Sequence, residues 1–350
     1  MTTAAPSTSR ARLLLWQLAL TAVALWLPII VGRIVLGAPA MTMLLFGTLS
    51  GLISTIAGGR RVGSAAAITF VLAAPIALVA GQDPIAGTCV IALACLLIGG
   101  ASYYKRYSGF SIILVGLLFT VTLPATVAGS LEGGLTQNEY LLRIVMGTAV
   151  CGFWPVIIVP LMHGVRSIPR TATYEIPDVA RYAVALAVLV GATTFYALVW
   201  GQQNHGVWLP LTLIMVMQVQ PGSAPHRTAQ RITGTVAGAI VAAVLATFFH
   251  QAWEIGAIFA LTTIGLLLTV GREPYGRFVF FLTILILTGV SAGEPALEAS
   301  LQRIWFTLLG CGIAIAVYLA KVVYLHHATA ARKRPIPAQV NEGRPANAGQ

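Results

Sequence analysis

Stretches of apolar residues alternate with short polar turns over almost the whole chain. A helix needs roughly 20 apolar residues to cross a bilayer. The chain contains twelve candidate stretches, at residues 13–36, 39–57, 62–80, 84–104, 109–129, 140–163, 178–200, 206–220, 229–249, 252–271, 275–294 and 299–325. The stretches 39–57 and 206–220 are short for a straight span, so we expect them to be tilted, broken or in a locally thinned bilayer. The pattern predicts an all-α polytopic membrane protein of about twelve transmembrane helices.

The composition of the chain agrees with this pattern. Hydrophobic residues make up 57% of the 350 residues and charged residues only 9%, whereas soluble domains carry roughly 25% charged residues. The net charge of +11 does not indicate nucleic-acid binding, because the basic residues lie scattered in the turns without a patch of interleaved aromatic residues. The first apolar stretch continues from Leu13 past Ile30, which is longer than the core of a signal peptide. We therefore expect an uncleaved first span.

Lysine and arginine concentrate in alternate turns and in the two tails. These turns and tails carry 18 of the 21 basic residues, and the opposite set of turns contains only Arg33, Arg143 and Arg303. Short loops rich in lysine and arginine stay in the cytoplasm. Both termini are therefore predicted to be cytoplasmic, and the number of spans is predicted to be even.

Similar residues recur at a nearly constant spacing in the two halves of the chain. Arg61 and Arg231 are 170 residues apart, and Arg143-Ile144 and Arg303-Ile304 are 160 residues apart. Two six-helix halves run in the same direction, so we expect a pseudo-two-fold axis along the membrane normal. The predicted organisation is a cytoplasmic N-terminus at 1–12, a first six-helix repeat at 13–163, a cytoplasmic linker at 164–177, a second six-helix repeat at 178–325, and a disordered basic tail at 326–350.

Arg227 and Arg231 lie in or just before the first turns of the stretch 229–249, near a helix N-terminus, and helix N-termini favour anions. Two interpretations are open for these residues. They form an anion-attracting cytoplasmic entrance, or they are topological anchors whose side chains extend to the membrane interface. Arg61 occupies the corresponding position in the first half, so the same two interpretations apply to it.

Arg143 and Arg303 break the positive-inside pattern, because each lies near the outer end of the last helix of its half. Charge is costly at such a position and is usually kept for pairing or transport. One interpretation is a helix-end ion pair in each half. Glu139 lies four residues before Arg143 and can pair with it along the helix, and Glu298 lies five residues before Arg303, which is a poorer register. The other interpretation is a twin anion-binding element at the interface between the repeats.

The short stretch 206–220 carries an unusual set of polar and aromatic residues. Trp208 is typical of the aromatic belt at a membrane interface. Thr212 and Gln218 predict either a polar strip that faces a cavity or hydrogen bonds between helices. In the stretch that follows, Gly234 and Gly238 begin a row of small residues, which predicts close packing against a neighbouring helix.

Several kinds of chemistry find no support in the sequence. The chain lacks the motifs GxxxxGK[ST] and HExxH, so we predict that it is not an enzyme and needs no cofactor or metal. The four cysteines lie inside apolar stretches, and we predict that they are buried packing residues. No carboxylate lies near the middle of a span, where a proton relay would need one.

One series of residues resembles the fusaric acid resistance and aromatic acid exporter family. It consists of Trp208, Leu211-Thr212, Gln220-Pro221, Gly222, Arg227, Arg231-Ile232, Gly234-Thr235, Gly238, and later Arg303-Ile304 to Gly312. The resemblance is good over 178–325 and weaker over 10–163. It is nearest to the short bacterial branch of uncharacterised inner-membrane proteins, because the larger exporters carry a substantial cytoplasmic domain where this chain has only a short linker.

This resemblance implies export of aromatic carboxylic acids or similar weak organic acids across a bacterial inner membrane, often with a periplasmic membrane-fusion adaptor. Plant aluminium-activated malate channels are distantly similar, which keeps a passive organic-anion channel, monomeric or homodimeric, as an alternative. A non-transporting scaffold or accessory subunit is a third hypothesis. Under the first hypothesis, cytoplasmic arginines attract the anion, outer arginines meet it near the exit, and polar and aromatic side chains contact it; the candidates are Arg61, Arg231, Arg227, Arg143, Arg303, Trp208, Thr212 and Gln218.

Overall fold

The computed structural model describes residues 7–36, 41–104, 107–122, 136–161, 175–200, 206–217, 224–249, 251–269, 274–290 and 296–332. Every regular element in these ranges is a helix, which confirms the all-α prediction. The α-helices are α1 (Ser7–Leu36), α2 (Met41–Ala80), α3 (Pro84–Ala101), α4 (Tyr107–Thr122), α6 (Gln137–Ile158), α7 (Ile176–Val199), α8 (Trp208–Val216), α9 (Ala224–Phe248), α10 (Ala252–Thr269), α11 (Tyr275–Val290) and α12 (Ala296–Arg332). Two short 3-10 turns, η2 (Ser102–Tyr104) and η3 (Val159–Leu161), follow α3 and α6.

The helix bounds differ from the predicted stretches in three places. The stretches 39–57 and 62–80 both fall in α2, which bends at Gly59, where a φ of 78° favours glycine. Of the stretch 206–220 the structure describes residues 206–217, and the helix there is the nine-residue α8, about 14 Å long and too short to cross a bilayer. The last helix continues to Arg332, so the first seven residues of the predicted tail are helical.

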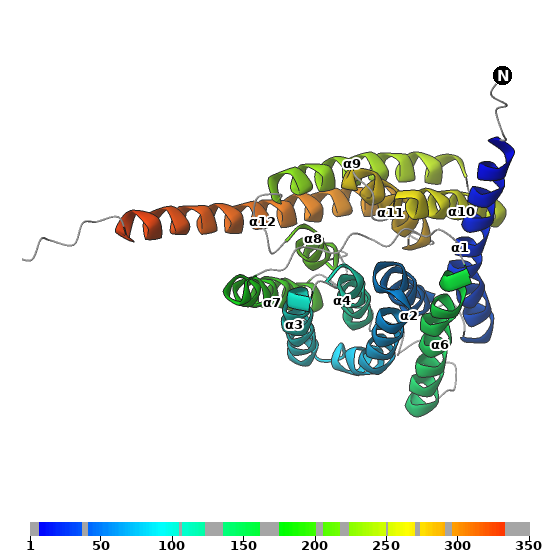
Figure 1. Cartoon of the computed structure of the whole chain (residues 1–350), viewed down its shortest axis with the longest axis horizontal. Coiled ribbons are helices and arrows are strands. Elements are labelled where there is room, and N and C mark those ends of the chain that lie inside the picture. The colour runs from blue at the N-terminus through cyan, green and yellow to red at the C-terminus, as the bar shows by residue number, and fades with distance from the viewer. Residues whose placement is uncertain are drawn as a thin grey trace, which may run out of the picture.

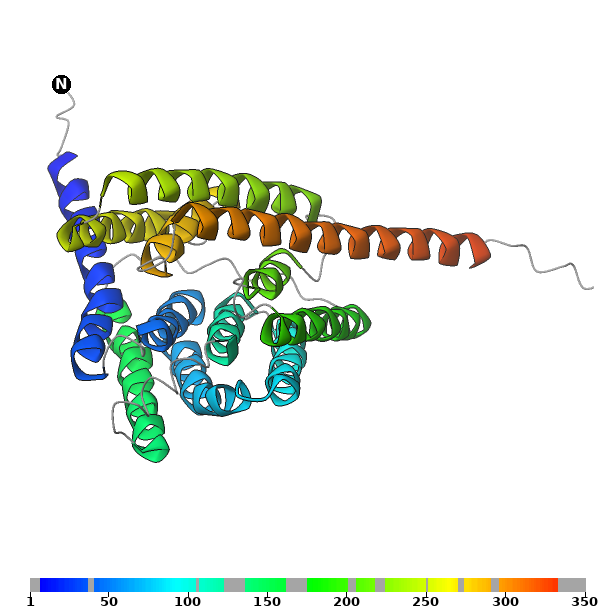
Figure 2. The same cartoon turned by 180° about the vertical axis from the view of Figure 1, so that it is seen from behind.

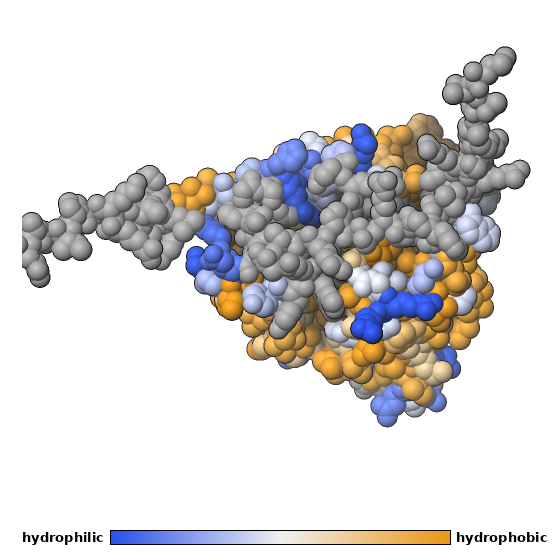
Figure 3. Space-filling view, in the orientation of Figure 1, coloured by the Kyte–Doolittle hydropathy of each residue, from blue (hydrophilic) through white to orange (hydrophobic). Residues whose placement is uncertain are grey.

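In the part of the chain that the structure describes, six helices are long and apolar enough to cross a membrane by length and composition: α2, α3, α6, α7, α9 and α12. The arrangement as twelve spans in two repeats stays a prediction. Figure 3 shows apolar side chains over much of the surface. On α6, for example, Leu142, Met146 and Val150 follow at steps of four and are each 60 or 61% exposed. An outward stripe of this kind suits lipid as the solvent and not water.

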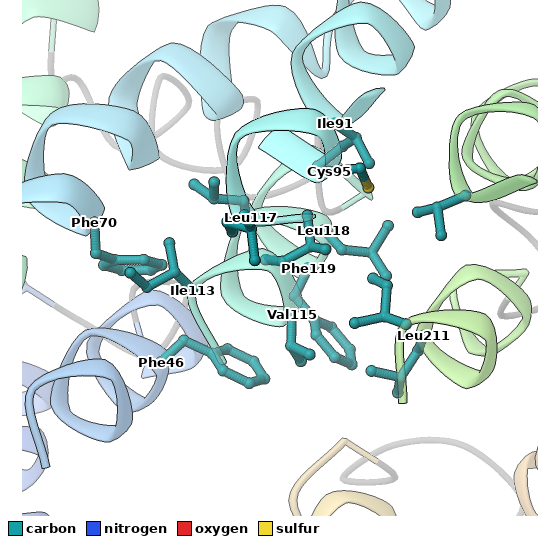
Figure 4. Packing of buried hydrophobic residues seen from close by; sticks show 14 of the residues in the cluster. Phe46, Phe70, Ile91, Cys95, Ile113, Val115, Leu117, Leu118, Phe119 and Leu211 are labelled. Atoms are coloured by element: carbon teal, nitrogen blue, oxygen red, sulfur yellow. The ribbon is translucent and has the colours of Figure 1, made fainter. Parts of the chain in front are cut away.

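The hydrophobic core is centred on α4. The segment from Ile113 to Val121 is buried almost without interruption, as expected of a helix that is apolar on all sides. Figure 4 shows Phe46 and Phe70 of α2, Ile91 and Cys95 of α3, and Leu211 of α8 around this helix. The core therefore joins the first half of the chain to α8 of the second half.

Figures 1 and 2 show the helices in two groups. Helices α9, α10, α11 and α12 lie together along one side, and α2, α3, α4 and α6 fill the other. Helix α8 joins the two groups, because it contacts α4 and α7 as well as α9 and α12, and α1 joins them at another place through its contacts with α2, α6 and α10. Helices α9 and α12 run antiparallel beside each other, and α12 extends far past the beginning of α9 (Figure 1).

Glycines allow the close approach of several of these helices. A Cβ atom on Gly234 would lie 2.5 Å from the carbonyl oxygen of Gly276, and one on Gly238 would lie 2.7 Å from that of Phe280. Real Cβ atoms do not approach other atoms this closely, so only glycine lets α9 and α11 pack at this distance. The prediction that the small residues of this stretch serve helix packing is confirmed.

We expect Gly310→Ala to destabilise the protein and to disturb the contact between α8 and α12. A Cβ atom at Gly310 would lie 2.9 Å from the Cβ and Cγ2 atoms of Thr212, whose side chain is fully buried. Overpacking of this kind costs about 1–3 kcal/mol. Gly312→Ala on the same helix is the matched control, because nothing lies within 4 Å of its added methyl group. Equal midpoints of thermal unfolding for the two purified variants would contradict the prediction.

Candidate functional site

Arg231 is the most unusual residue of α9. It lies in the second turn of the helix, and its side chain is 0% exposed. None of its three guanidinium nitrogens has a hydrogen-bond partner among the described residues. An anchor would reach the membrane interface, so the structure does not support anchoring as the role of Arg231.

Arg303 of α12 is also 0% exposed, and its Nε and Nη2 atoms have no hydrogen-bond partner in the described part of the chain. Its guanidinium carbon lies 4.1 Å from the centre of the Trp208 ring, which is a cation–π contact. Arg303 is also close enough to Arg231 for the two positive charges to repel each other. Two buried cations therefore share one site.

Trp208 holds its place because α8 is wedged between α4 and α12. Its ring is 2% exposed and meets the ring of Phe119 edge-on at 5.7 Å. Phe119 in turn stacks on Phe46 at 5.0 Å, so an aromatic row leads from α2 to Arg303. The predicted position of Trp208 in an interfacial belt is wrong, because the side chain is part of the core. One face of the ring is covered by Arg303, so the expected stacking of a substrate on Trp208 has no support on that face.

A third arginine lies one turn nearer the beginning of α9. Arg227 is half-buried, and its guanidinium carbon lies 4.4 Å from the centre of the Tyr275 ring at the beginning of α11. Tyr275 is also within electrostatic range of Arg303. We call this group the arginine cluster, and its members are Arg227, Arg231, Arg303, Trp208 and Tyr275 from helices α8, α9, α11 and α12.

Two threonines extend the cluster. Thr235 follows Arg231 by four residues on α9, and Thr307 follows Arg303 by four on α12, so each lies on the same helix face as its arginine. Both are buried, and neither hydroxyl has a partner among the described residues. Most other helical threonines of this protein, such as Thr212, donate to the carbonyl four residues earlier, at 2.8 Å in that case. The hydroxyls of Thr235 and Thr307 are thus open to a ligand.

No carboxylate among the described residues compensates the two buried charges. Glu298 is exposed and accepts a hydrogen bond from Gln302 at 3.3 Å, so the predicted pair with Arg303 is wrong. Glu139 is also exposed, and its carboxylate accepts hydrogen bonds from the backbone nitrogen and hydroxyl of Thr136, both at 2.9 Å, in a capping box. It therefore serves to begin α6. Arg143 attracts this carboxylate electrostatically, but the two side chains do not form an ion pair.

A buried ion costs several kcal/mol even after the protein relaxes around it. A guanidinium stays ionised inside proteins and presents five N–H donors in a fork that fits a carboxylate or a phosphate. Arg231 and Arg303 together therefore form a site that favours an anion strongly. The hydroxyls of Thr235 and Thr307 can donate two further hydrogen bonds to it.

The structure does not bring the first-half arginines to this cluster. Arg61 follows the bend in α2 and is exposed, and Arg143 lies on the outward face of α6 beside Leu142. Thr212 is buried, with its hydroxyl bonded within α8 and its methyl group against Gly310, so it does not line a polar strip. Gln218 lies outside the described residues.

The hypothesis that Arg231 and Arg303 serve separate entrance and exit sites is not supported, because the two residues lie on packed helices within electrostatic range of each other. The reason is the offset between α9 and α12. Each arginine lies in the second turn of its helix, and antiparallel helices of equal extent would place them at opposite ends. Because α12 extends past the beginning of α9, the first halves of the two helices lie beside each other (Figure 2).

Sequence reasoning missed Tyr275, Thr235 and Thr307 as members of the site. The two threonines had a visible signal, since the spacing R-x-x-x-T occurs at both Arg231 and Arg303. Tyr275 carries no such signal, because its place beside Arg227 depends on how α9 packs against α11.

We expect Trp208→Leu to weaken anion binding, because the ring that positions the Arg303 guanidinium is removed. Cation–π contacts contribute about 0.5–2 kcal/mol, which corresponds to a loss of affinity of about 2- to 30-fold. Trp208→Phe keeps an aromatic face and should lose less. Titration of the purified variants with an aromatic carboxylate measures the effect. Equal affinities for Trp208→Leu and the unmodified protein would show that Arg303 does not depend on the ring.

Residues 181–317 match the family model described as fusaric acid resistance protein-like. The matched segment covers less than half of the chain, yet it contains every member of the arginine cluster. This confirms the resemblance noted in the second half of the sequence. The fusaric acid resistance-like segment begins at Arg181 in α7 and ends in α12, whereas Arg61 and Arg143 lie outside it.

Curated relatives match a similar share of the chain. Inner membrane protein YccS of Escherichia coli K12 is 29% identical over 157 residues, which is 44% of this chain and 22% of the relative. An uncharacterized protein, ORF2, of Neisseria gonorrhoeae is 34% identical over 141 residues, 39% of this chain and 33% of the relative. An uncharacterized protein of Haemophilus influenzae is 30% identical over 147 residues, 41% of this chain and 20% of the relative.

The chain thus matches between 20% and 33% of the length of these relatives. No solved structure gives a significant match. The apolar helices and the match to an inner membrane protein establish a membrane protein with a fusaric acid resistance-like second half.

Proposed function

We propose that this protein is a secondary transporter that exports aromatic or other weak organic acids as anions across a bacterial inner membrane. The observation that carries the proposal is the arginine cluster. Two fully buried guanidinium groups share one site, and the described residues offer them no counter-charge. The match to a fusaric acid resistance protein-like family supports the same function.

The parts of the cluster have distinct roles in this proposal. Arg231 and Arg303 bind the carboxylate by paired N–H donors, and Thr235 and Thr307 donate from their hydroxyls. Trp208 positions Arg303, as its 4.1 Å contact indicates. Arg227 is half-buried over Tyr275, so it meets the anion before the buried pair does. An arginine at the edge of the site raises the local concentration of anions.

Efflux of a labelled aromatic acid from cells that express the protein tests the proposal. The comparison is with the double variant Arg231→Ala/Arg303→Ala, each measured with and without an uncoupler. Efflux that is lost in the variant and sensitive to the uncoupler is the expected result. Efflux that follows the membrane potential without a proton gradient would instead identify a passive anion channel. A phenotype untouched by the double substitution would favour the scaffold hypothesis.

A further inference from the structure

We propose that the arginine cluster takes a dianion, an organic acid whose two carboxylates are both ionised. This inference rests on the proposed function, because it names the class of anion that the same site would bind. It follows from the charges, the donor groups and the surroundings of Arg231 and Arg303.

Charge balance is the first argument. Arg231 and Arg303 are fully buried, and arginine keeps its proton in proteins. The described carboxylates are all exposed or half-exposed, at helix ends and turns. With the described residues alone, a monoanion would leave one of the two buried positive charges without a partner, whereas a dianion would provide a partner for each. Uncompensated charge in a buried site is strongly unfavourable.

The number of open donors is the second argument. Five guanidinium nitrogens, three on Arg231 and two on Arg303, are buried without a hydrogen-bond partner in the described part of the chain. Together they carry about eight N–H groups, whereas a carboxylate offers about four acceptor positions. The hydroxyls of Thr235 and Thr307 add two more donors. One carboxylate leaves more than half of these donors without an acceptor, whereas two carboxylates, with about eight acceptor positions, can accept from most of them.

The placement of the donors is the third argument. Arg231 and Arg303 come from two different helices that pack against each other, α9 and α12, so their guanidinium groups enter the site from two sides. Each has its own threonine one turn along its helix. The site therefore has two similar halves, each formed by one arginine and one threonine. Each half fits one carboxylate of a dicarboxylic acid.

Binding of simple aromatic acids to the purified full-length protein tests this inference. The probes are benzoate, which is a monoanion, and phthalate, isophthalate and terephthalate, which are dianions at neutral pH with increasing distance between the carboxylates. We expect at least one dianion to bind about tenfold or more tightly than benzoate. In Arg231→Gln and in Arg303→Gln, this preference should fall to about threefold or less, because one half of the site is lost.

Arg143→Gln is the matched control, because Arg143 is exposed and lies outside the cluster; this variant should keep the preference. If benzoate binds as tightly as every dicarboxylate, the inference that the site prefers a dianion is overturned. If Arg231→Gln then removed benzoate binding, the anion site of the proposed function would still stand. A preference for dianions that survives in both cluster variants would also overturn the inference. The second carboxylate would then be bound by residues other than Arg231 and Arg303. Binding of none of the four probes would contradict both proposals.

Discussion

Replacing Arg231 with methionine is expected to stabilise the purified protein against heat while it abolishes anion binding. The Arg231 side chain is fully buried, its nitrogens have no partner among the described residues, and the Arg303 charge lies close by. Methionine fills a similar volume without the cost of a buried charge and removes the repulsion. Replacement of buried ionic groups by apolar residues stabilises other proteins by about 1–4 kcal/mol.

The measurement is the midpoint of thermal unfolding in detergent, with and without a saturating dicarboxylate. Ligand should raise the midpoint of the unmodified protein, since a compound that binds only the folded state stabilises it, and should leave Arg231→Met unchanged. Arg61→Met is the matched control, because Arg61 is the exposed counterpart at a spacing of 170 residues. Surface substitutions of this kind change stability by about 0.5 kcal/mol or less. A clear loss of stability in Arg231→Met would mean that the free protein already compensates this charge.

Single substitutions of the four matched arginines are expected to divide into two groups in an efflux assay. Arg231→Gln and Arg303→Gln should lower the rate of efflux by about 10- to 100-fold, because a charged hydrogen bond contributes about 1.5–3 kcal/mol. Arg61→Gln and Arg143→Gln should stay within about twofold of the unmodified protein. The first two side chains are fully buried in the cluster, and the other two are exposed.

Uptake into inside-out vesicles that contain equal amounts of each variant is the cleanest measurement, since expression differences are then removed. Glutamine keeps the length and polarity of the side chain, so a loss of transport reports the charge. Equal losses of transport at all four positions would support an anion path through both halves, as the duplication predicts. A loss of transport at Arg61 and Arg143 alone would place the anion site in the first half and would contradict the proposed role of the arginine cluster.

These two predictions are connected by one physical conflict. An anion site inside an apolar protein needs buried positive charge, and burying this charge lowers the stability of the folded protein. The ligand-free protein is therefore less stable than the protein with a bound anion. Substitutions that relieve the cost should therefore stabilise the fold and remove the function. Functional sites commonly show this opposition between stability and activity.

Several features of this protein could be predicted from its sequence alone. The helical class and the approximate positions of the helices follow from local hydropathy, because a chain in a bilayer must satisfy its backbone hydrogen bonds within each segment. The resemblance over 178–325 and the packing role of Gly234 and Gly238 were visible for similar reasons. Each of these features depends on residues that are close together in the chain.

The composition of the site depended on the tertiary structure. The duplication treats Arg231 and Arg61 as equivalent, and likewise Arg303 and Arg143, yet only the second-half pair is buried and shared between helices. Trp208 is a residue type that is common at the membrane–water interface, yet its side chain lies in the core. Hydropathy assigns a residue to a helix, but the offset between α9 and α12 and the faces they turn to each other are set by packing. Glycines such as Gly310 permit that packing, and it decides which distant charges meet.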